Sequence, residues 1–127
     1  MREVLRDFDP PVRLHVCGEG DEALQFLRGE GKYSGAPLPG LIFLDFNLPR
    51  SDSREILKYI KGDERLRLIP IAVLTSSGAE RDIREAYQLQ ANCYLRKPVD
   101  LDGFFRTIRE AAHFWLEVAQ VASDESA

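Results

Sequence analysis

Three side chains that could handle a phosphoryl group follow three separate apolar segments of the chain. They are Asp45, Thr75 and Lys97. A carboxylate is a useful phosphoryl acceptor because the acyl phosphate that it forms is labile and its formation needs little beyond positioning and charge neutralisation. A hydroxyl can bond one phosphoryl oxygen, and an ammonium group can balance the charge of another. Alone, Asp45 could equally be a turn residue or a helix cap, so the prediction depends on the three residues meeting.

The elements that would position these residues alternate along the chain. Apolar runs bounded by turn residues predict strands, and apolar residues at helical spacing predict helices. We expect strands at 12–17, 41–46, 68–74 and 93–95, and helices at 22–28, around 56–60, at 80–89, and from 101 to about 121 after a cap at Asp100. This alternation predicts an α/β fold with a doubly wound parallel sheet. Ligands of such sheets bind at the carboxyl ends of the strands, where Asp45, Thr75 and Lys97 would meet.

Length and composition restrict the possible functions. The chain has 127 residues, 44% hydrophobic and 30% charged, with a net charge of -4. One globular domain with a sizeable core is expected. The acidic balance disfavours nucleic acid as a direct partner. No apolar stretch approaches the length of a membrane span, and no signal peptide is visible, so we predict a cytoplasmic protein with no membrane partner.

The two cysteines, Cys17 and Cys93, lie in predicted strands and form no CxxC motif. We interpret them as buried free thiols, the usual state in cytosolic proteins. His15 and Cys17 would share one face of a strand, but zinc needs four ligands and the sequence offers no partners for them, so a metal site there is disfavoured.

Three motifs make the chain resemble the response regulator receiver domains of two-component signalling. They are residues 44–49 (LDFNLP), 73–77 (VLTSS) and 94–98 (YLRKP). Their spacing also agrees, with 30 positions from Asp45 to Thr75 and 52 from Asp45 to Lys97. The resemblance covers residues 12 to about 118. In finer detail the chain is similar to the stand-alone regulators that partner phytochrome-type histidine kinases.

The resemblance implies a flavodoxin-like receiver fold and a role for each of five residues. Asp45 would be the phosphoacceptor, Thr75 and Lys97 would contact the phosphoryl group, and Tyr94 would be the aromatic switch. Mg²⁺ would be held by Asp45 and by the backbone carbonyl of Asn47. The protein would then be no enzyme but a signalling module that accepts a phosphoryl group from a sensor histidine kinase.

One departure from the family concerns the start of the chain. Receivers open with a strand that ends in a pair of acidic residues, which hold the Mg²⁺, and this sequence shows neither. Asp7 and Asp9 would lie at the wrong end of the sheet. We therefore expect residues 1–127 to form a single receiver domain that is truncated at its N-terminal side, without an output domain and with a weakened metal site. A fragment or an internal start, an oligomer that fills the gap and a true degenerate receiver all remain open.

A second departure is Ser53, which stands where receivers commonly have glycine. We expect it to alter the loop beside Asp45, since glycine reaches positive φ easily, and to leave the chemistry unchanged.

Three functions remain possible. The first is the phosphorelay receiver, which would signal through protein contacts. Its last helix and last strand, with Phe114 and Trp115 on adjoining helix faces, are a candidate surface for a homodimer. The second is a phosphorylation-independent interaction module, favoured by the missing acidic pair. The third, a small flavodoxin-like cofactor binder, is disfavoured because the turn at residues 18–21 is acidic and suits a phosphate poorly. His113 is expected to be a solvated helix residue and not a phosphate carrier.

Overall fold

The computed structural model describes residue 8 and residues 12–46 and 52–122. Within these ranges, three parallel strands are combined with four α-helices and three short helical turns. The strands are β1 (Ile42–Asp45), β2 (Ile71–Thr75) and β3 (Cys93–Arg96). The α-helices are α1 (Gly20–Arg28), α2 (Asp52–Gly62), α3 (Glu80–Gln88) and α4 (Leu101–His113). The turns are η2 (Gly31–Tyr33), η3 (Leu66–Leu68) and the π-helical η4 (Phe114–Val118).

The sheet has the strand order β1-β2-β3, so β2 is central. Ile42 pairs with Ile71 and Ala72 pairs with Cys93, which sets the register of the two parallel ladders. All five residues of β2 are buried. The central strand β2 is therefore covered on both faces, whereas in β1 only Leu44 is buried and in β3 no residue is.

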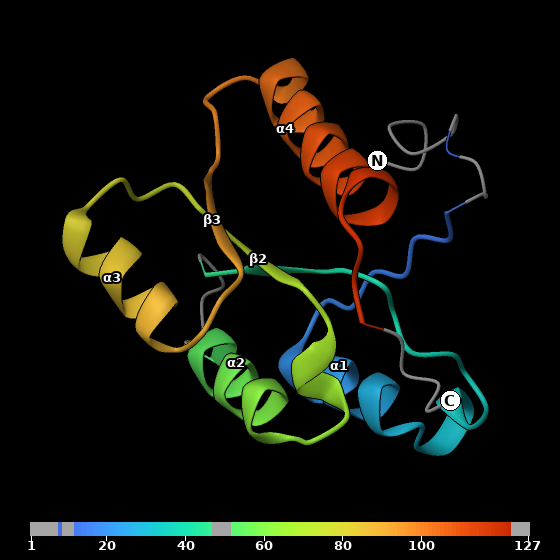
Figure 1. Cartoon of the computed structure of the whole chain (residues 1–127). Helices are drawn as coiled ribbons and strands as arrows, with labels where there is room; N and C mark the ends of the chain where they lie inside the picture. Colours follow the sequence, from blue (N-terminus) through green and yellow to red (C-terminus); the bar gives the residue numbers. More distant parts are fainter. Residues whose placement is uncertain (1–7, 9–11, 47–51, 123–127) are drawn as a thin grey trace.

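Helices cover both faces of this sheet. Figure 1 shows α4 on one side and α1, α2 and α3 on the other. The larger core lies on the side of α1 to α3 and includes the fully buried residues Leu57, Ile60, Ile71 and Val73. On the opposite side Ala112 of α4 packs with Phe8. The predicted doubly wound α/β architecture is confirmed.

Local signals in the sequence explain where two of the helices begin or end. Asp100 caps α4, accepting a 2.9 Å hydrogen bond from the backbone N–H of Gly103, as predicted. Gly29 follows α1 with a φ of 68°, a left-handed conformation that glycine adopts without strain. The last helix is shorter than expected, because α4 ends at His113 and η4 carries the helical path only to Val118.

The strand predicted at residues 12–17 is wrong, because this segment is neither helix nor strand. Its alternation is real, since Val12 and Leu14 pack against the core that contains Phe8 and Ala112. A strand also needs a neighbour to share backbone hydrogen bonds. The described sheet ends at β1, so no strand is in place beside residues 12–17.

None of the helices in the described part of the chain combines the length and the apolar character needed to cross a membrane.

Candidate functional site

The carboxylate of Asp45 lies at the carboxyl end of β1 and is paired with Lys97. Asp45 is the last residue of β1, and Lys97 directly follows β3. Lys97 Nζ donates a 2.7 Å hydrogen bond to Asp45 Oδ2. The Asp45 side chain is 34% exposed and the Lys97 side chain is 26% exposed. A charge-assisted hydrogen bond of this length holds the ammonium group against the carboxylate while leaving both accessible to an incoming ligand.

Thr75 ends β2, the strand between the two that carry Asp45 and Lys97. Its backbone carbonyl accepts a 2.7 Å hydrogen bond from the N–H of Lys97, which fixes the start of the segment after β3. The Thr75 side chain is buried, and its hydroxyl oxygen accepts a 3.1 Å hydrogen bond from the N–H of Ser77. The hydroxyl hydrogen itself can still serve a ligand as donor. The structure thus places all three predicted residues at the same edge of the sheet, and joins Asp45 to Lys97 directly.

Tyr94 lies on β3 with its ring half-buried against the larger core. Its hydroxyl donates a 2.8 Å hydrogen bond to the carbonyl of Ser77. The carbonyl of Ser77 thus accepts a hydrogen bond from the Tyr94 hydroxyl, and the N–H of Ser77 donates one to the Thr75 hydroxyl oxygen. Through this one residue the aromatic side chain is connected to the hydroxyl at the end of β2.

Ser53 is a residue of this edge whose part the sequence reasoning missed. It is the second residue of α2, is 1% exposed, and donates a 2.5 Å hydrogen bond from Oγ to the backbone carbonyl of Asp45. Ser53 lies within α2 and is not among the described residues with positive φ. The loop that it was expected to alter, residues 47–51, lies outside the described residues. The signal available in the sequence was a serine three positions before the first apolar residue of the amphipathic helix that follows Asp45.

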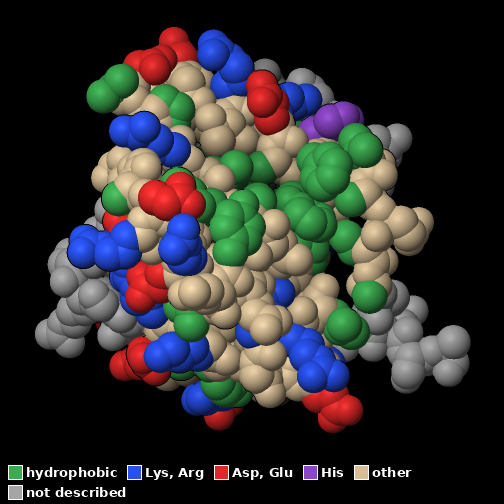
Figure 2. Space-filling model, turned by 60° about the vertical axis from the view of Figure 1, so that its left-hand side comes forward, with side chains coloured by type: hydrophobic (Ala, Val, Ile, Leu, Met, Phe, Trp, Pro, Cys, Tyr) green, Lys and Arg blue, Asp and Glu red, His purple; other side chains and the backbone are tan. Residues whose placement is uncertain are grey.

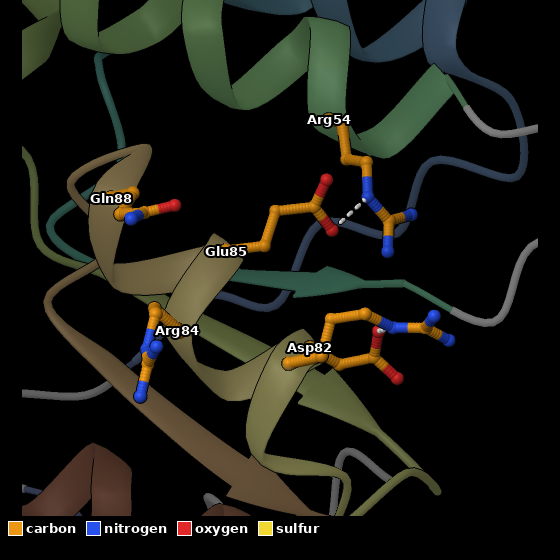
Figure 3. Close-up of a pocket in the computed structure, with 6 residues that line it drawn as sticks. Arg54, Asp82, Arg84, Glu85 and Gln88 are labelled. Carbon is orange, nitrogen blue, oxygen red and sulfur yellow. Dashed lines mark hydrogen bonds and ion pairs between the residues drawn. The ribbon is translucent and has the colours of Figure 1, made fainter.

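The first turn of α2 also contacts the residue after Asp45. The guanidinium of Arg54 lies 4.6 Å from the centre of the Phe46 ring, and its Nε donates a 2.6 Å hydrogen bond to Glu85 of α3. Beside this pair is an open cleft of about 470 Å³ (Figure 3). Its lining residues are Arg54, Arg81, Asp82, Arg84, Glu85 and Gln88. Asp45, Thr75 and Lys97 are not among them, and the arginines have acidic neighbours, so we do not regard this cleft as the phosphoryl site.

The predicted metal ligands are described only in part. Asp45 is in place, whereas Asn47 lies outside the described residues. Within residues 8, 12–46 and 52–122 there is no group of three His, Cys, Asp or Glu side chains that could hold a metal ion. Mg²⁺ in phosphate sites usually relies on one or two carboxylates together with the phosphate and water. The described residues therefore do not make a complete Mg²⁺ site.

The contacts of the cysteines and histidines are with neighbouring protein side chains. Cys17 and Cys93 are free, as predicted, but they are only partly buried and not buried as expected. Burial still raises the pKa of both thiols. His15 is exposed and stacks on Phe26 with ring centres 4.2 Å apart. His113 is exposed and pairs with Glu117 at 2.6 Å, as expected of a solvated helix residue.

The chain is similar to known proteins in sequence and in fold. The family model of the response regulator receiver domain matches residues 1–109. Response regulator Rcp1 of Synechocystis sp. is 40% identical over 117 residues, covering 92% of this chain and 80% of that protein. The crystal structure of the phosphorylated cyanobacterial phytochrome response regulator RcpA matches with a TM-score of 0.89 and 40% identity, over 96% of this chain and 87% of that one. The Mn²⁺-bound form of Rcp1 matches with a TM-score of 0.86 and 38% identity, over 96% and 88% of the two chains.

Proposed function

The chain belongs to the response regulator receiver domain family, and we propose that it is the phosphoacceptor of a two-component phosphorelay, with Asp45 as the accepting residue. The observation that carries the proposal is the 2.7 Å contact between Lys97 Nζ and Asp45 Oδ2 at the sheet edge where Thr75 also ends its strand. A nucleophilic carboxylate, a cation and a hydroxyl donor at one edge are the groups that phosphoryl transfer needs.

The proposed reaction is a transfer from a phosphohistidine of a sensor kinase, the partner class of receiver domains. A carboxylate oxygen of Asp45 forms a bond to phosphorus as the phosphorus–nitrogen bond breaks, and the imidazole leaves with the electron pair and takes up a proton. Lys97 would neutralise charge on the phosphoryl oxygens, and Thr75 would donate its hydroxyl hydrogen to one of them. These three side chains are the groups that the described residues supply for this reaction.

The proposed cofactor is Mg²⁺, bound weakly. One structure similar to this chain is a Mn²⁺-bound response regulator. In this chain Asp45 and the carbonyl of Asn47 would be ligands, and when bound the ion would neutralise charge between the carboxylate and the phosphoryl group.

Phosphorylation would change the surface through the connection from Thr75 to Tyr94. When the Thr75 hydroxyl turns to the phosphoryl group, its bond with the N–H of Ser77 weakens, and Ser77 also holds the Tyr94 hydroxyl. Tyr94 would then shift between two positions and bias the surface of α3, β3 and α4 toward one partner.

A homodimer through the last helix and strand is part of the proposal. Three large apolar side chains on α4 and η4 are exposed: Leu101 at 65%, Phe114 at 48% and Val118 at 60%. Figure 2 shows hydrophobic side chains gathered in the upper right of one face, while charged side chains dominate its left and lower parts. Exposed apolar groups of this kind favour protein contacts. We propose the cytoplasm as the compartment, because the kinase partners of the family act there.

A mass measurement tests the proposed acceptor. The purified chain is incubated with Mg²⁺ and phosphoramidate, and its intact mass is recorded beside the variants Asp45→Asn and Asp102→Asn. Asp102 is an exposed carboxylate in the first turn of α4, so its substitution controls for unspecific phosphorylation. We expect the wild type and Asp102→Asn to gain one phosphoryl group and Asp45→Asn to gain none. Equal gain by all three proteins would contradict the assignment of Asp45.

The second candidate is a phosphorylation-independent interaction module. It is favoured by the lack of a three-ligand metal group in the described part of the chain. The two functions differ in the Asp45→Asn variant, because only a phosphorelay would lose signalling while its fold and partner binding persist.

A further inference from the structure

The peptide unit between Asp45 and Phe46 is held at both of its polar ends. Its N–H, which belongs to Phe46, donates a 2.8 Å hydrogen bond to the carbonyl of Leu74 on β2. Its carbonyl, which belongs to Asp45, accepts the 2.5 Å hydrogen bond from Ser53 Oγ on α2. A peptide plane that is bonded on both sides cannot rotate without breaking one bond. Since this plane begins at the Cα of Asp45, holding it restrains the ψ angle of Asp45 and the backbone from which the carboxylate extends.

The hydroxyl of Ser53 is placed for this contact by its burial. At 1% exposure it is one of the two polar side chains among the buried residues of the described chain, the other being Thr75. A buried hydroxyl without a hydrogen-bond partner raises the free energy of the native state. The hydrogen bond from Ser53 to the Asp45 carbonyl is therefore expected to persist. Ser53 therefore contacts the backbone of Asp45 from the buried interior of the protein.

The next residue strengthens the attachment of α2 to this peptide. Arg54 lies over the ring of Phe46 at 4.6 Å and is itself bonded to Glu85 of α3 at 2.6 Å. Figure 3 shows Arg54 reaching from α2 toward Glu85 on the facing helix. Two consecutive residues of one helical turn thus contact two consecutive residues at the end of β1. The backbone of Asp45 is consequently tied to α2 as well as to the sheet.

We propose that Ser53 is a positioning residue for phosphorylation: its hydroxyl fixes the Asp45–Phe46 peptide and so keeps the Asp45 carboxylate directed at Lys97. The proposal rests on the proposed function, because it assigns a role in the reaction at Asp45. Receiver domains commonly have glycine at the position of Ser53, and a glycine has no side chain that could donate this hydrogen bond. Small displacements of a reacting group lower rates steeply, about 10²-fold for a shift of about 1 Å.

The test compares Ser53→Ala with a variant that is destabilised elsewhere. Ile108→Val removes one methylene from a 3% exposed side chain on α4, on the other side of the sheet. Its cost to stability is similar to that of a lost hydrogen bond. Two quantities are measured in the purified 127-residue chain. They are the rate of phosphorylation by phosphoramidate, and the hydrogen-exchange rate of the Phe46 amide relative to that of Val73 in the middle of β2. Ser53→Cys is measured beside Ser53→Ala, because it keeps the side-chain size and has only a weak S–H donor.

We expect Ser53→Ala to phosphorylate about tenfold more slowly and to exchange the Phe46 amide about tenfold faster relative to Val73, while Ile108→Val changes neither by more than about twofold. An unchanged phosphorylation rate in both Ser53 variants would overturn the proposal. If the wild type itself is not phosphorylated, the proposed function fails. The positioning of the peptide is then judged by the exchange data alone, and a Phe46 amide that responds no more in Ser53→Ala than in Ile108→Val would overturn it.

Discussion

Replacing Lys97 by glutamine should slow phosphorylation far more than it lowers stability. At 2.7 Å the attraction between the ammonium group and the Asp45 carboxylate is about 6 kcal/mol at an effective dielectric constant of about 20, and about 1.5 kcal/mol in bulk water. Both side chains are a quarter to a third exposed, so desolvation and lost side-chain freedom offset most of this attraction. We expect Lys97→Gln to lower the free energy of unfolding by about 1 kcal/mol.

We expect the substitution to affect the phosphorylation rate more than stability. During the reaction, the Lys97 ammonium group of the wild type faces a phosphoryl group as well as the Asp45 carboxylate, and the variant loses both contacts. Electrostatic stabilisation of developing charge by one positioned group is worth about 3 kcal/mol, or about 10²-fold in rate. The rate is followed by intact mass against time with phosphoramidate, and stability by urea unfolding.

The control is Lys58→Gln, which removes another ion pair, the exposed contact of Lys58 with Glu55 at 3.4 Å on α2. This variant should keep the wild-type rate. The reasoning is refuted if Lys97→Gln loses about 1 kcal/mol of stability yet phosphorylates within about threefold of the wild type.

Three further predictions concern the surroundings of the site. Tyr94→Phe removes the hydroxyl that donates to the Ser77 carbonyl but keeps the ring, so urea unfolding should show a loss of about 1 kcal/mol, and an unchanged midpoint would contradict that contact. The pKa of the Cys93 thiol is raised mainly by burial, so its reaction with a disulfide reagent at pH 8 should be slower in the native protein than in urea; equal rates would show that the thiol is not protected. Hydrogen bonds from the backbone N–H groups of Leu66 and Arg65 lower the pKa of the Asp63 carboxyl group. The ionised carboxylate therefore stabilises the native state at pH values above the ordinary aspartate pKa. This stabilisation is lost as the pH falls through the lower pKa of the native state. The urea midpoints of the wild type and Asp63→Asn should therefore differ at pH 7 and converge in acid. A difference in midpoint that persists below the native pKa of Asp63 would contradict the role assigned to these hydrogen bonds.

The site was largely predictable because each of its residues follows an apolar run. In a parallel sheet all carboxyl ends meet at one edge, so the positions of Asp45, Thr75 and Lys97 after three runs were enough to bring them together. The strands and helices that carry them were predicted from the same pattern, and β2, with every residue buried, had the clearest signal.

The errors have physical causes as well. Residues 12–17 alternate as a strand does, and Val12 and Leu14 do pack inward, but pairing depends on a neighbour that periodicity cannot reveal. Ser53 was judged by the backbone freedom of the glycine that it replaces, whereas its importance comes from a hydrogen bond to a carbonyl eight positions earlier in the chain. Tertiary hydrogen bonds of side chains leave no periodic trace in a sequence.

Chemical trapping of the phosphorylated residue tests the central claim most directly. Borohydride reduces an acyl phosphate, and at an aspartate the product is homoserine. The chain is phosphorylated with phosphoramidate, reduced and digested, and its peptides are sequenced by tandem mass spectrometry. We predict homoserine at position 45 and unchanged aspartate at Asp102, with no conversion when the phosphodonor is left out. Homoserine at another position, or none at position 45 in protein that has gained a phosphoryl group, would contradict Asp45 as the phosphoacceptor.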